Sequence, residues 1–377
     1  KEVREKAILD VAAPLIKTSD VKGKIIGAGP AGLAVAHFGS NHMISFRYRL
    51  KNVPMKIAEK SFTVANTEFP AGSFVLAGGL TPEVRAAVEQ LGLTAAVLDT
   101  LPSVPLHDGD APRVAIYSQW SGTQELGWYR DAFDKFGIPY ELIYKERIQK
   151  GNLKGDYDVI IMAAQNIGRS SVLQAPAARP SPYQKSDKYK FLGMYGETTD
   201  TTGGFGEVGV EAFQKFFEAG GTLIATVGAV RFPIEFGFAH TVDTESVQGV
   251  NAQKPLVQAE IVRTDHPVFY GYPDKIIPIK YAQGQQFFRV GTADTGNILA
   301  RFVGGDSAVL SGLMEGGAAI AQRAFGVDVP EAYHGKGRVI MFSNNPVYRW
   351  QNHGEFNMVF NSIINWMVNL QDAKSPS

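Results

Sequence analysis

At 377 residues, the chain is longer than one ordinary domain, so its length predicts two domains. Its 37 basic side chains balance 37 acidic ones, which argues against nucleic acid or an anionic membrane as a partner, and no apolar run is long enough to span a bilayer. The chain has no cysteine, which excludes a thiol nucleophile, a disulfide and a thiolate metal site.

Residues 1–22 are predicted to be a lead-in segment, with scattered apolar positions on either side of Pro14. The chain starts with Lys1 rather than methionine, and no signal peptide is visible. We therefore expect it to be a processed or excised piece of a longer protein.

Residues 23–100 are predicted to form a small mixed α/β domain. A helix is expected at 41–50, because its apolar residues would share one face. A second helix is expected to begin at Thr81-Pro82, with the threonine as N-cap and the proline in the first turn, and to end at Gly92. Short strands are expected at 56–58, 62–64, 73–76 and 95–98.

The segment from Gly27 to Gly32, Gly-Ala-Gly-Pro-Ala-Gly, matches the Gly-x-Gly-x-x-Gly pattern of FAD- and NAD-binding proteins. That fingerprint needs a continuous helix after its third glycine, whose N-terminal amides hold the pyrophosphate. A helix-breaking cluster follows at 39–41, and residues 33–37 fit a strand at least as well as a helix. We interpret the motif as a glycine-rich turn between two strands. An FAD- or NAD-binding oxidoreductase that uses Gly27–Gly32 stays the alternative function.

Residues 101–111, rich in proline and polar residues, are predicted to be a linker, and residues 112–377 a second domain. Strands separated by helices at this spacing predict a doubly wound, flavodoxin-like parallel sheet, whose ligand sites lie beyond the carboxyl ends of the strands. The expected strands are 113–117, 140–144, 157–162, 222–226 and 337–342, and the expected helices are 128–136, 207–219 and 356–367.

Several motifs occur in an order that is shared with a known family. They are FRYRLKNV (46–53), FPAGSFV (69–75), GWYR (127–130), GIPY (137–140), FQKFFEAGGTLI (213–224), EFG (235–237) and FSNNPVYR (342–349). The chain resembles the region after the catalytic domain of bacterial zinc-carboxypeptidase-like (carboxypeptidase A-like) proteins. Its second domain resembles the class I glutamine-amidotransferase-like module of those proteins. The resemblance covers most of Lys22 to Trp366.

The resemblance implies two kinds of catalytic centre, and the sequence lacks the residues of both. Zinc peptidases of this family hold the metal with His-x-x-Glu and a distant histidine, and none of the seven histidines has a glutamate at that spacing. Glutamine amidotransferases place a cysteine on the turn that reads Thr226-Val227-Gly228 here, and we interpret Thr226 as a strand-end residue. We therefore expect no catalytic, cofactor or metal residue in this chain, with zinc only in a peptidase domain upstream of Lys1.

Two polar loops are the candidate ligand sites. Gln119 and Trp120 follow the first strand of the second domain, where a ligand loop of such a sheet lies, although a capped loop is the alternative. Arg349, Trp350 and His353 follow a later strand and suit a glycan or a peptide carboxylate, or equally a turn held by its own side chains. A cryptic hydrolase in this second loop is a further alternative.

These observations predict a non-catalytic ancillary region that serves recognition or assembly in a zinc-carboxypeptidase-like protein. Its expected partners are the peptidase domain of the same parent or other protein chains, with a peptide or glycan as ligand and no nucleic acid. The resemblance implies a periplasmic or secreted location.

Overall fold

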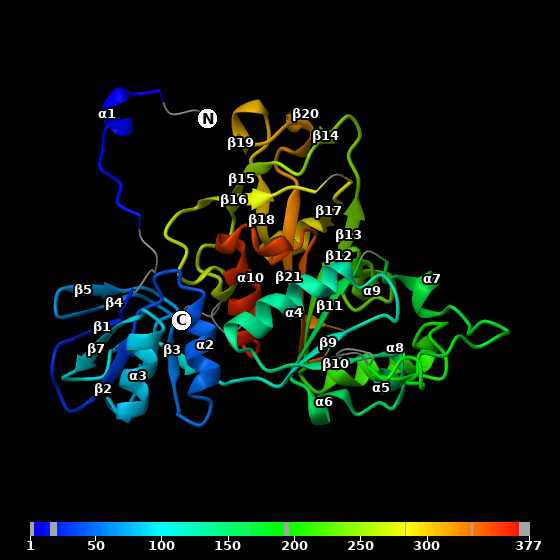
Figure 1. The fold of residues 1–377 in the computed structure, drawn as a ribbon, viewed down its shortest axis with the longest axis horizontal. Helices are drawn as coiled ribbons and strands as arrows, with labels where there is room; N and C mark the ends of the chain where they lie inside the picture. The colour runs from blue at the N-terminus through cyan, green and yellow to red at the C-terminus, as the bar shows by residue number, and fades with distance from the viewer. Residues whose placement is uncertain are drawn as a thin grey trace.

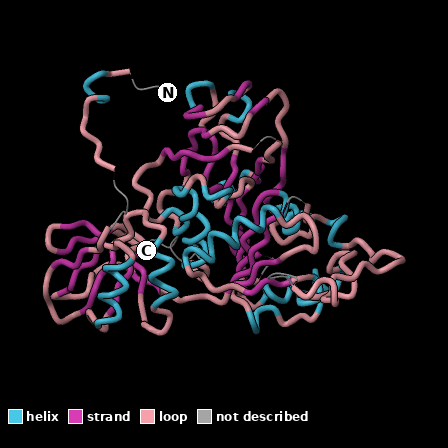
Figure 2. Tube along the Cα trace, viewed as in Figure 1, coloured by secondary structure: helices cyan, strands magenta, loops and turns pink. Residues whose placement is uncertain are grey.

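The computed structural model describes residues 4–15, 21–164, 166–191, 196–282, 284–332 and 335–368. Their helices and strands form a small sheet with two helices, a parallel sheet between helices, and an antiparallel extension (Figure 1, Figure 2). The described part of the lead-in carries the short helix α1 (Lys6–Leu9) and runs away from both sheets with its side chains exposed (Figure 1). Within the described residues, no helix has both the length and the apolarity needed to cross a membrane.

The first part is a six-stranded mixed sheet in the order β1-β7-β2-β6-β3-β8. Thr81 caps α3 as predicted, because its Oγ1 accepts a hydrogen bond from Val84 N–H at 3.2 Å. Helices α2 and α3 pack on one face of the sheet, and the β4–β5 hairpin packs on the other. The elements are β1 (Lys24–Ile26), β2 (Gly32–Val35), α2 (His42–Arg49), β3 (Lys56–Ala58), β4 (Phe62–Val64), β5 (Thr67–Phe69), β6 (Phe74–Leu76), α3 (Pro82–Gln90), β7 (Thr94–Leu98) and β8 (Leu106–Asp108).

Strand β8 lies within the stretch 101–111 that the sequence predicts to be a linker. It pairs antiparallel with β3, so that Ala58 lies opposite Leu106 and Lys56 opposite Asp108. Lys56 also forms an ion pair with Asp108 at 2.5 Å. Part of the predicted linker is therefore a strand that pairs with β3. This pairing gives partners to backbone donors and acceptors that an unpaired sheet edge would leave without them.

The glycine motif lies in the turn between β1 and β2. Gly27 has a φ of 75°, and a Cβ atom on Gly29 would lie 2.5 Å from the carbonyl oxygen of Leu98 in β7. Glycine therefore lets the turn run against the backbone of β7. The residues from Gly32 onward form strand β2, which agrees with the interpretation as a turn between two strands. In this fully described segment, a strand stands where the dinucleotide fingerprint requires a helix.

The second part is built on five parallel strands in the order β10-β9-β11-β12-β22. Numbered along the chain, this order is 2-1-3-4-5, that of flavodoxin-like sheets, so the predicted fold class is confirmed. The elements are β9 (Val114–Tyr117), α4 (Gln124–Phe136), β10 (Glu141–Ile143), α5 (Lys145–Gln149), α6 (Leu153–Asp156), β11 (Val159–Ala164), α7 (Arg169–Val172), α8 (Gly206–Glu218), β12 (Thr222–Val227), α9 (Arg231–Glu235), β22 (Gly337–Phe342) and α10 (His353–Ile364).

Alternate residues of the parallel strands enter two different cores. Ile116 and Ile161 pack in the core that contains α4 and α10, whereas Ile160 and Leu223 pack in the core that contains α8. Both faces of the sheet are therefore covered by helices, as a doubly wound sheet requires. The helix α8 supplies three buried aromatic rings that the sequence predicts to be core: Phe213, Phe216 and Phe217.

An antiparallel extension continues the parallel sheet beyond β22, in the order β22-β21-β18-β15-β16 (Figure 1). The sequence gives no prediction for these strands. Because β16 ends on the same side as the carboxyl ends of β12 and β22, the extension contributes side chains there. Its strands are β13 (Val242–Glu245), β15 (Leu256–Ile261), β16 (Ile276–Lys280), β17 (Phe287–Val290), β18 (Ile298–Phe302), β19 (Val309–Ser311) and β21 (Ala324–Ala332). A separate two-stranded sheet is formed by β14 (Asn251–Ala252) and β20 (Met314–Glu315).

The first and second parts share one core, to which α2, α4 and α10 all contribute. Polar contacts reinforce it. His37 Nε2 lies 2.9 Å from Asn361 Oδ1, and Ser45 Oγ donates to the Phe136 carbonyl oxygen at 2.8 Å. Asn357 Nδ2 donates to the Gly39 carbonyl oxygen at 2.7 Å. Helix α10 therefore connects the two parts, since it supplies a partner to the end of β2 and to the loop after it.

Candidate functional site

The turn after β12 is where the resemblance to glutamine amidotransferases would place a catalytic cysteine. Val227 has φ 58° and ψ −130°, and the single turn of 3-10 helix η1 (Gly228–Val230) and then α9 follow it directly. A β-branched residue at positive φ is strained by about 1–3 kcal/mol. Thr226 is fully buried and its Oγ1 accepts a hydrogen bond from the Tyr129 hydroxyl at 3.2 Å. The sharp turn is thus present, and an alkyl side chain occupies it.

We predict that Val227→Gly leaves the unfolding free energy unchanged within about 0.5 kcal/mol or raises it, because glycine adopts this backbone conformation without strain. Urea unfolding measures the effect. Val97, a partly buried valine in strand β7, is the matched control. Val97→Gly should cost about 1–2 kcal/mol through lost burial and added chain entropy. Equal losses in the two variants would show that Val227 is not strained.

A cavity of about 410 Å³ lies beside this turn, beyond the carboxyl ends of β12 and β22. We call it the elbow pocket. Its volume falls within the range of sites that bind small molecules. Most of its lining residues have polar side chains; the lining comprises Glu125, Asn166, Val227, Gly228, Arg231, Lys254, Lys280, Tyr281, Ala282, Gly284, Gln285, Gln286, Ser343, Asn344, Asn345 and Tyr348.

The floor of the elbow pocket is the buried tripeptide Ser343-Asn344-Asn345 that follows β22. Ser343 Oγ accepts a hydrogen bond from Gln285 Nε2 at 2.9 Å, and Asn345 Nδ2 donates to Glu125 Oε2 at 2.7 Å. Hydrogen bonds of this kind fix the orientation of buried amides. The floor is therefore a preorganised polar surface.

A buried carboxyl group, Glu355 at the start of α10, lies behind this floor. Its oxygens accept hydrogen bonds from Asn344 Nδ2 at 2.6 Å and from Lys280 N–H at 2.8 Å. Burial raises the pKa of Glu355 to about 8, because the ionised form loses its hydration, although the hydrogen bonds from Lys280 N–H and Asn352 oppose this change. At neutral pH most of this carboxyl is therefore uncharged.

Three cationic side chains line the elbow pocket, and they come from three different segments. Arg231, at the start of α9, donates through Nε to Glu235 Oε1 at 2.7 Å. Lys280 is the last residue of β16. Lys254 precedes β15, and its Nζ donates to the Tyr348 hydroxyl at 2.6 Å. The arrangement can bind a polar, negatively charged group, since ammonium and amide donors surround one cavity.

The predicted ligand residues Gln119 and Trp120 line a second cavity, of about 280 Å³, beside the point where the strand order reverses between β9 and β11. Gln119 Nε2 donates to the Asn166 carbonyl oxygen at 3.2 Å. Trp120 stacks on Tyr144 with ring centroids 4.0 Å apart, so one face of the indole is already covered. The loop thus lies where the sequence places a ligand loop, but its aromatic ring packs against the protein.

The other predicted residues lie outside both cavities, on the outer side of α4 and α10. The Trp350 ring contacts those of His353 and Phe136, with centroids 4.6 and 5.5 Å apart. The Arg349 guanidinium lies 5.9 Å from the centroid of the Trp128 ring. These contacts lie within the turn and between the turn and α4. Tyr348, which directly precedes Arg349, does line the elbow pocket.

The pocket residues that the sequence did not reveal come mainly from the antiparallel extension: Lys254, Lys280, Tyr281, Gln285 and Gln286. No motif marks them, because they meet only through strand pairing over long distances in the chain. The polar cluster Asn344-Asn345 after the last parallel strand was the one signal available, since ligand sites of such sheets lie at carboxyl ends.

No family model matches the sequence, and no curated protein matches it. Among solved structures, the chain is similar to a ThuA-like protein from Bacteroides uniformis, with 12% identity over 68% of this chain and 90% of that chain and a TM-score of 0.40. A ThuA-like protein from Parabacteroides merdae is 10% identical over 68% of this chain and 91% of that chain, with a TM-score of 0.41. The β-galactosidase from Bacillus circulans is 12% identical over 67% of this chain and 30% of that chain, with a TM-score of 0.37. Similarity at this level says nothing of a shared ligand or activity.

Proposed function

We propose that this chain is a non-catalytic recognition module that binds a small polar ligand, a short peptide or a glycan, in the elbow pocket. The observation that carries the proposal is Val227. A side chain without a nucleophilic atom stands on the strained turn beside a preorganised polar cavity. An enzyme of the glutamine-amidotransferase type needs a thiol at this position, whereas a binding site needs only the cavity and its donors.

We further propose that the module belongs to a zinc-carboxypeptidase-like protein that is exported to the periplasm or secreted, and that it works beside the peptidase domain of that parent. The order of the motifs between residues 46 and 349 supports this assignment. The genomic reading frame upstream of Lys1 tests it. A His-x-x-Glu motif followed by a distant histidine is expected there, and a frame without them would overturn the proposed parent.

Binding of a panel of short peptides and oligosaccharides tests the recognition proposal. The wild type should bind at least one member, and Gln286→Trp, which adds an indole to the pocket lining, should weaken that binding at least about tenfold by steric exclusion. Gln214→Trp, a partly exposed glutamine on α8, is the matched control and should bind as the wild type does. Hydrolysis of a bound member by the wild type, or binding that survives Gln286→Trp, would overturn the proposal.

A further inference from the structure

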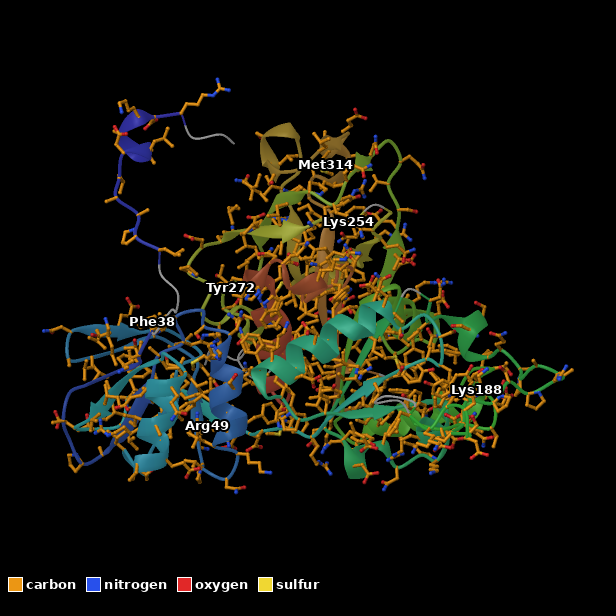
Figure 3. All side chains as sticks on the ribbon, viewed as in Figure 1. Phe38, Arg49, Lys188, Lys254, Tyr272 and Met314 are labelled. Carbon is orange, nitrogen blue, oxygen red and sulfur yellow. The ribbon has the colours of Figure 1, made fainter. Side chains whose placement is uncertain are left out.

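Lys254 and Lys280 lie close together because of the pairing of β15 with β16. Leu256 lies opposite Lys280 in the register of the two strands, and Tyr281 N–H donates to the Pro255 carbonyl oxygen at 3.0 Å. Lys254 therefore lies just beyond the pair that ends β16, and both lysines line the elbow pocket. Figure 3 shows Lys254 on the upper, antiparallel part of the molecule.

Neither lysine is neutralised by an ion pair within the described residues. The Lys254 Nζ atom contacts the neutral Tyr348 hydroxyl at 2.6 Å. Glu355 accepts a hydrogen bond from the backbone N–H of Lys280 at 2.8 Å, and burial raises the pKa of that carboxyl to about 8. The third cation of the pocket, Arg231, differs in that Glu235 already binds it at 2.7 Å. Lys254 and Lys280 thus both line the elbow pocket without an ion-pair partner among the described residues.

Glu125, the acidic residue in the lining, offsets one of these two positive charges. It is 8% exposed, and its carboxylate also accepts a hydrogen bond from the Asn345 amide. The remaining polar lining consists of carboxamides and phenols, including Gln285 and Tyr281. Such groups hydrogen-bond a ligand but do not neutralise a charge. The cavity therefore has an excess of positive charge that a ligand can complement.

We propose that the elbow pocket recognises a carboxylate, with Lys254 and Lys280 as the two residues that bind it. This inference rests on the proposed recognition function and names the chemistry of its ligand. A carboxylate matches two ammonium donors at a partly desolvated site, where a charge-assisted hydrogen bond is about twice as strong as a neutral one. The C-terminus of a peptide and the carboxylate of an acidic sugar supply the same group.

Calorimetric titration of the full chain with matched probes tests the inference and separates the two sources. The peptide pair is tri-alanine and its C-terminal amide, and the sugar pair is galacturonate and galactose. At least one carboxylate probe should bind about tenfold more tightly than its neutral counterpart, since a hydrogen bond to a charged group contributes about 1.5–3 kcal/mol. The pair that shows this difference identifies whether the carboxylate comes from a peptide or from an acidic sugar.

Lys254→Met and Lys280→Met should each weaken binding of that carboxylate about tenfold, because methionine keeps an apolar stem but removes the ammonium group. Lys188→Met is the control, since Lys188 lies near the right-hand tip of the molecule, well away from Lys254 (Figure 3), and the affinity of this variant should equal that of the wild type. A thermal unfolding midpoint near that of the wild type verifies that each variant is folded.

Two results would overturn the carboxylate inference but would not by themselves overturn the proposed recognition function. Equal affinity for the neutral and the charged member of a pair would show that the pocket binds ligands but does not select a carboxylate. Failure of both carboxylate probes to bind would also overturn the inference. The recognition proposal would then fall only if the wider panel of peptides and oligosaccharides also showed no binding.

Discussion

Replacing Arg338 with methionine should lower the unfolding free energy by about 3–5 kcal/mol, because it leaves a buried carboxylate without its cation. Arg338 in β22 and Asp328 in β21 are 5% and 7% exposed. The guanidinium donates to both carboxylate oxygens, through Nε at 2.8 Å and Nη2 at 2.9 Å. Urea unfolding, extrapolated to zero denaturant, measures the loss.

The charge of Asp328 depends on its two partners. Burial opposes its ionisation, but the charge of Arg338 and the hydrogen bond from His266 outweigh burial and hold the pKa of this carboxyl below its ordinary value. His266 contributes as a neutral donor, because burial lowers its own pKa. Without Arg338, the carboxyl must either stay charged in an apolar setting or take up a proton. Both outcomes destabilise the folded state.

A surface ion pair is the matched control for this prediction. Arg289 and Asp243 pair across β17 and β13 with side chains that are 66% and 58% exposed. Arg289→Met should therefore cost less than about 1 kcal/mol. A double variant, Arg338→Met with Asp328→Asn, should lose less than the sum of its single variants, since each removes the same interaction. Additive losses, or a cost for Arg338→Met below 1 kcal/mol, would contradict the buried-pair account.

The parallel part of the fold could be predicted from the sequence because its signals are local. Each buried strand is a short apolar run, and helices such as α4 end at a glycine, Gly137, whose φ of 66° suits a helix C-cap. The extension between 242 and 332 carries no comparable signal. Its strands pair across large sequence separations, and β15 alternates partly buried with buried residues, a pattern that depends on what covers the sheet.

The candidate site could be predicted only as a location. The rule that ligands bind beyond the carboxyl ends of parallel strands points to the edge at which both cavities lie, and Gln119 and Asn345 line them. The rule cannot say which polar residues point into a cavity and which pack on neighbours. Trp350 shows the difference, because its ring contacts Phe136 and Phe356 rather than the pocket. An aromatic ring near a predicted site can pack in the core as readily as it can bind a ligand.

Glu355→Gln should abolish a loss of stability that the wild type shows as the pH rises from about 6.5 to 8. The unfolded chain releases the proton of this carboxyl near pH 4.5, whereas the folded protein keeps it until the pH approaches about 8. Between these values the unfolded state binds fewer protons than the folded state. Rising pH therefore favours unfolding, by up to about 1.4 kcal/mol per pH unit.

The difference between the wild type and Glu355→Gln isolates this carboxyl from the buried histidines. Burial lowers the pKa of His37 to about 4 from its ordinary value of 6.5, and burial also lowers the pKa values of His42 and His266. Their effect has the opposite sign, since the unfolded state binds the extra proton, and it fades as the pH rises above about 6.5. Both proteins carry these histidines, so their effect cancels in the difference.

Glutamine at position 355 reproduces the protonated carboxyl, because its amide can donate to Asn344 once that side chain turns its oxygen inward. Urea unfolding at pH 6.5, 7.2 and 8 should show the stability of the wild type falling relative to that of Glu355→Gln. Glu315→Gln, at an exposed glutamate, should follow the wild type. The same pH dependence in the wild type and Glu355→Gln would mean that Glu355 is ionised at neutral pH. The ionised Glu355 would then compensate the positive charge of Lys280. A carboxylate ligand would as a result be attracted less strongly to the elbow pocket.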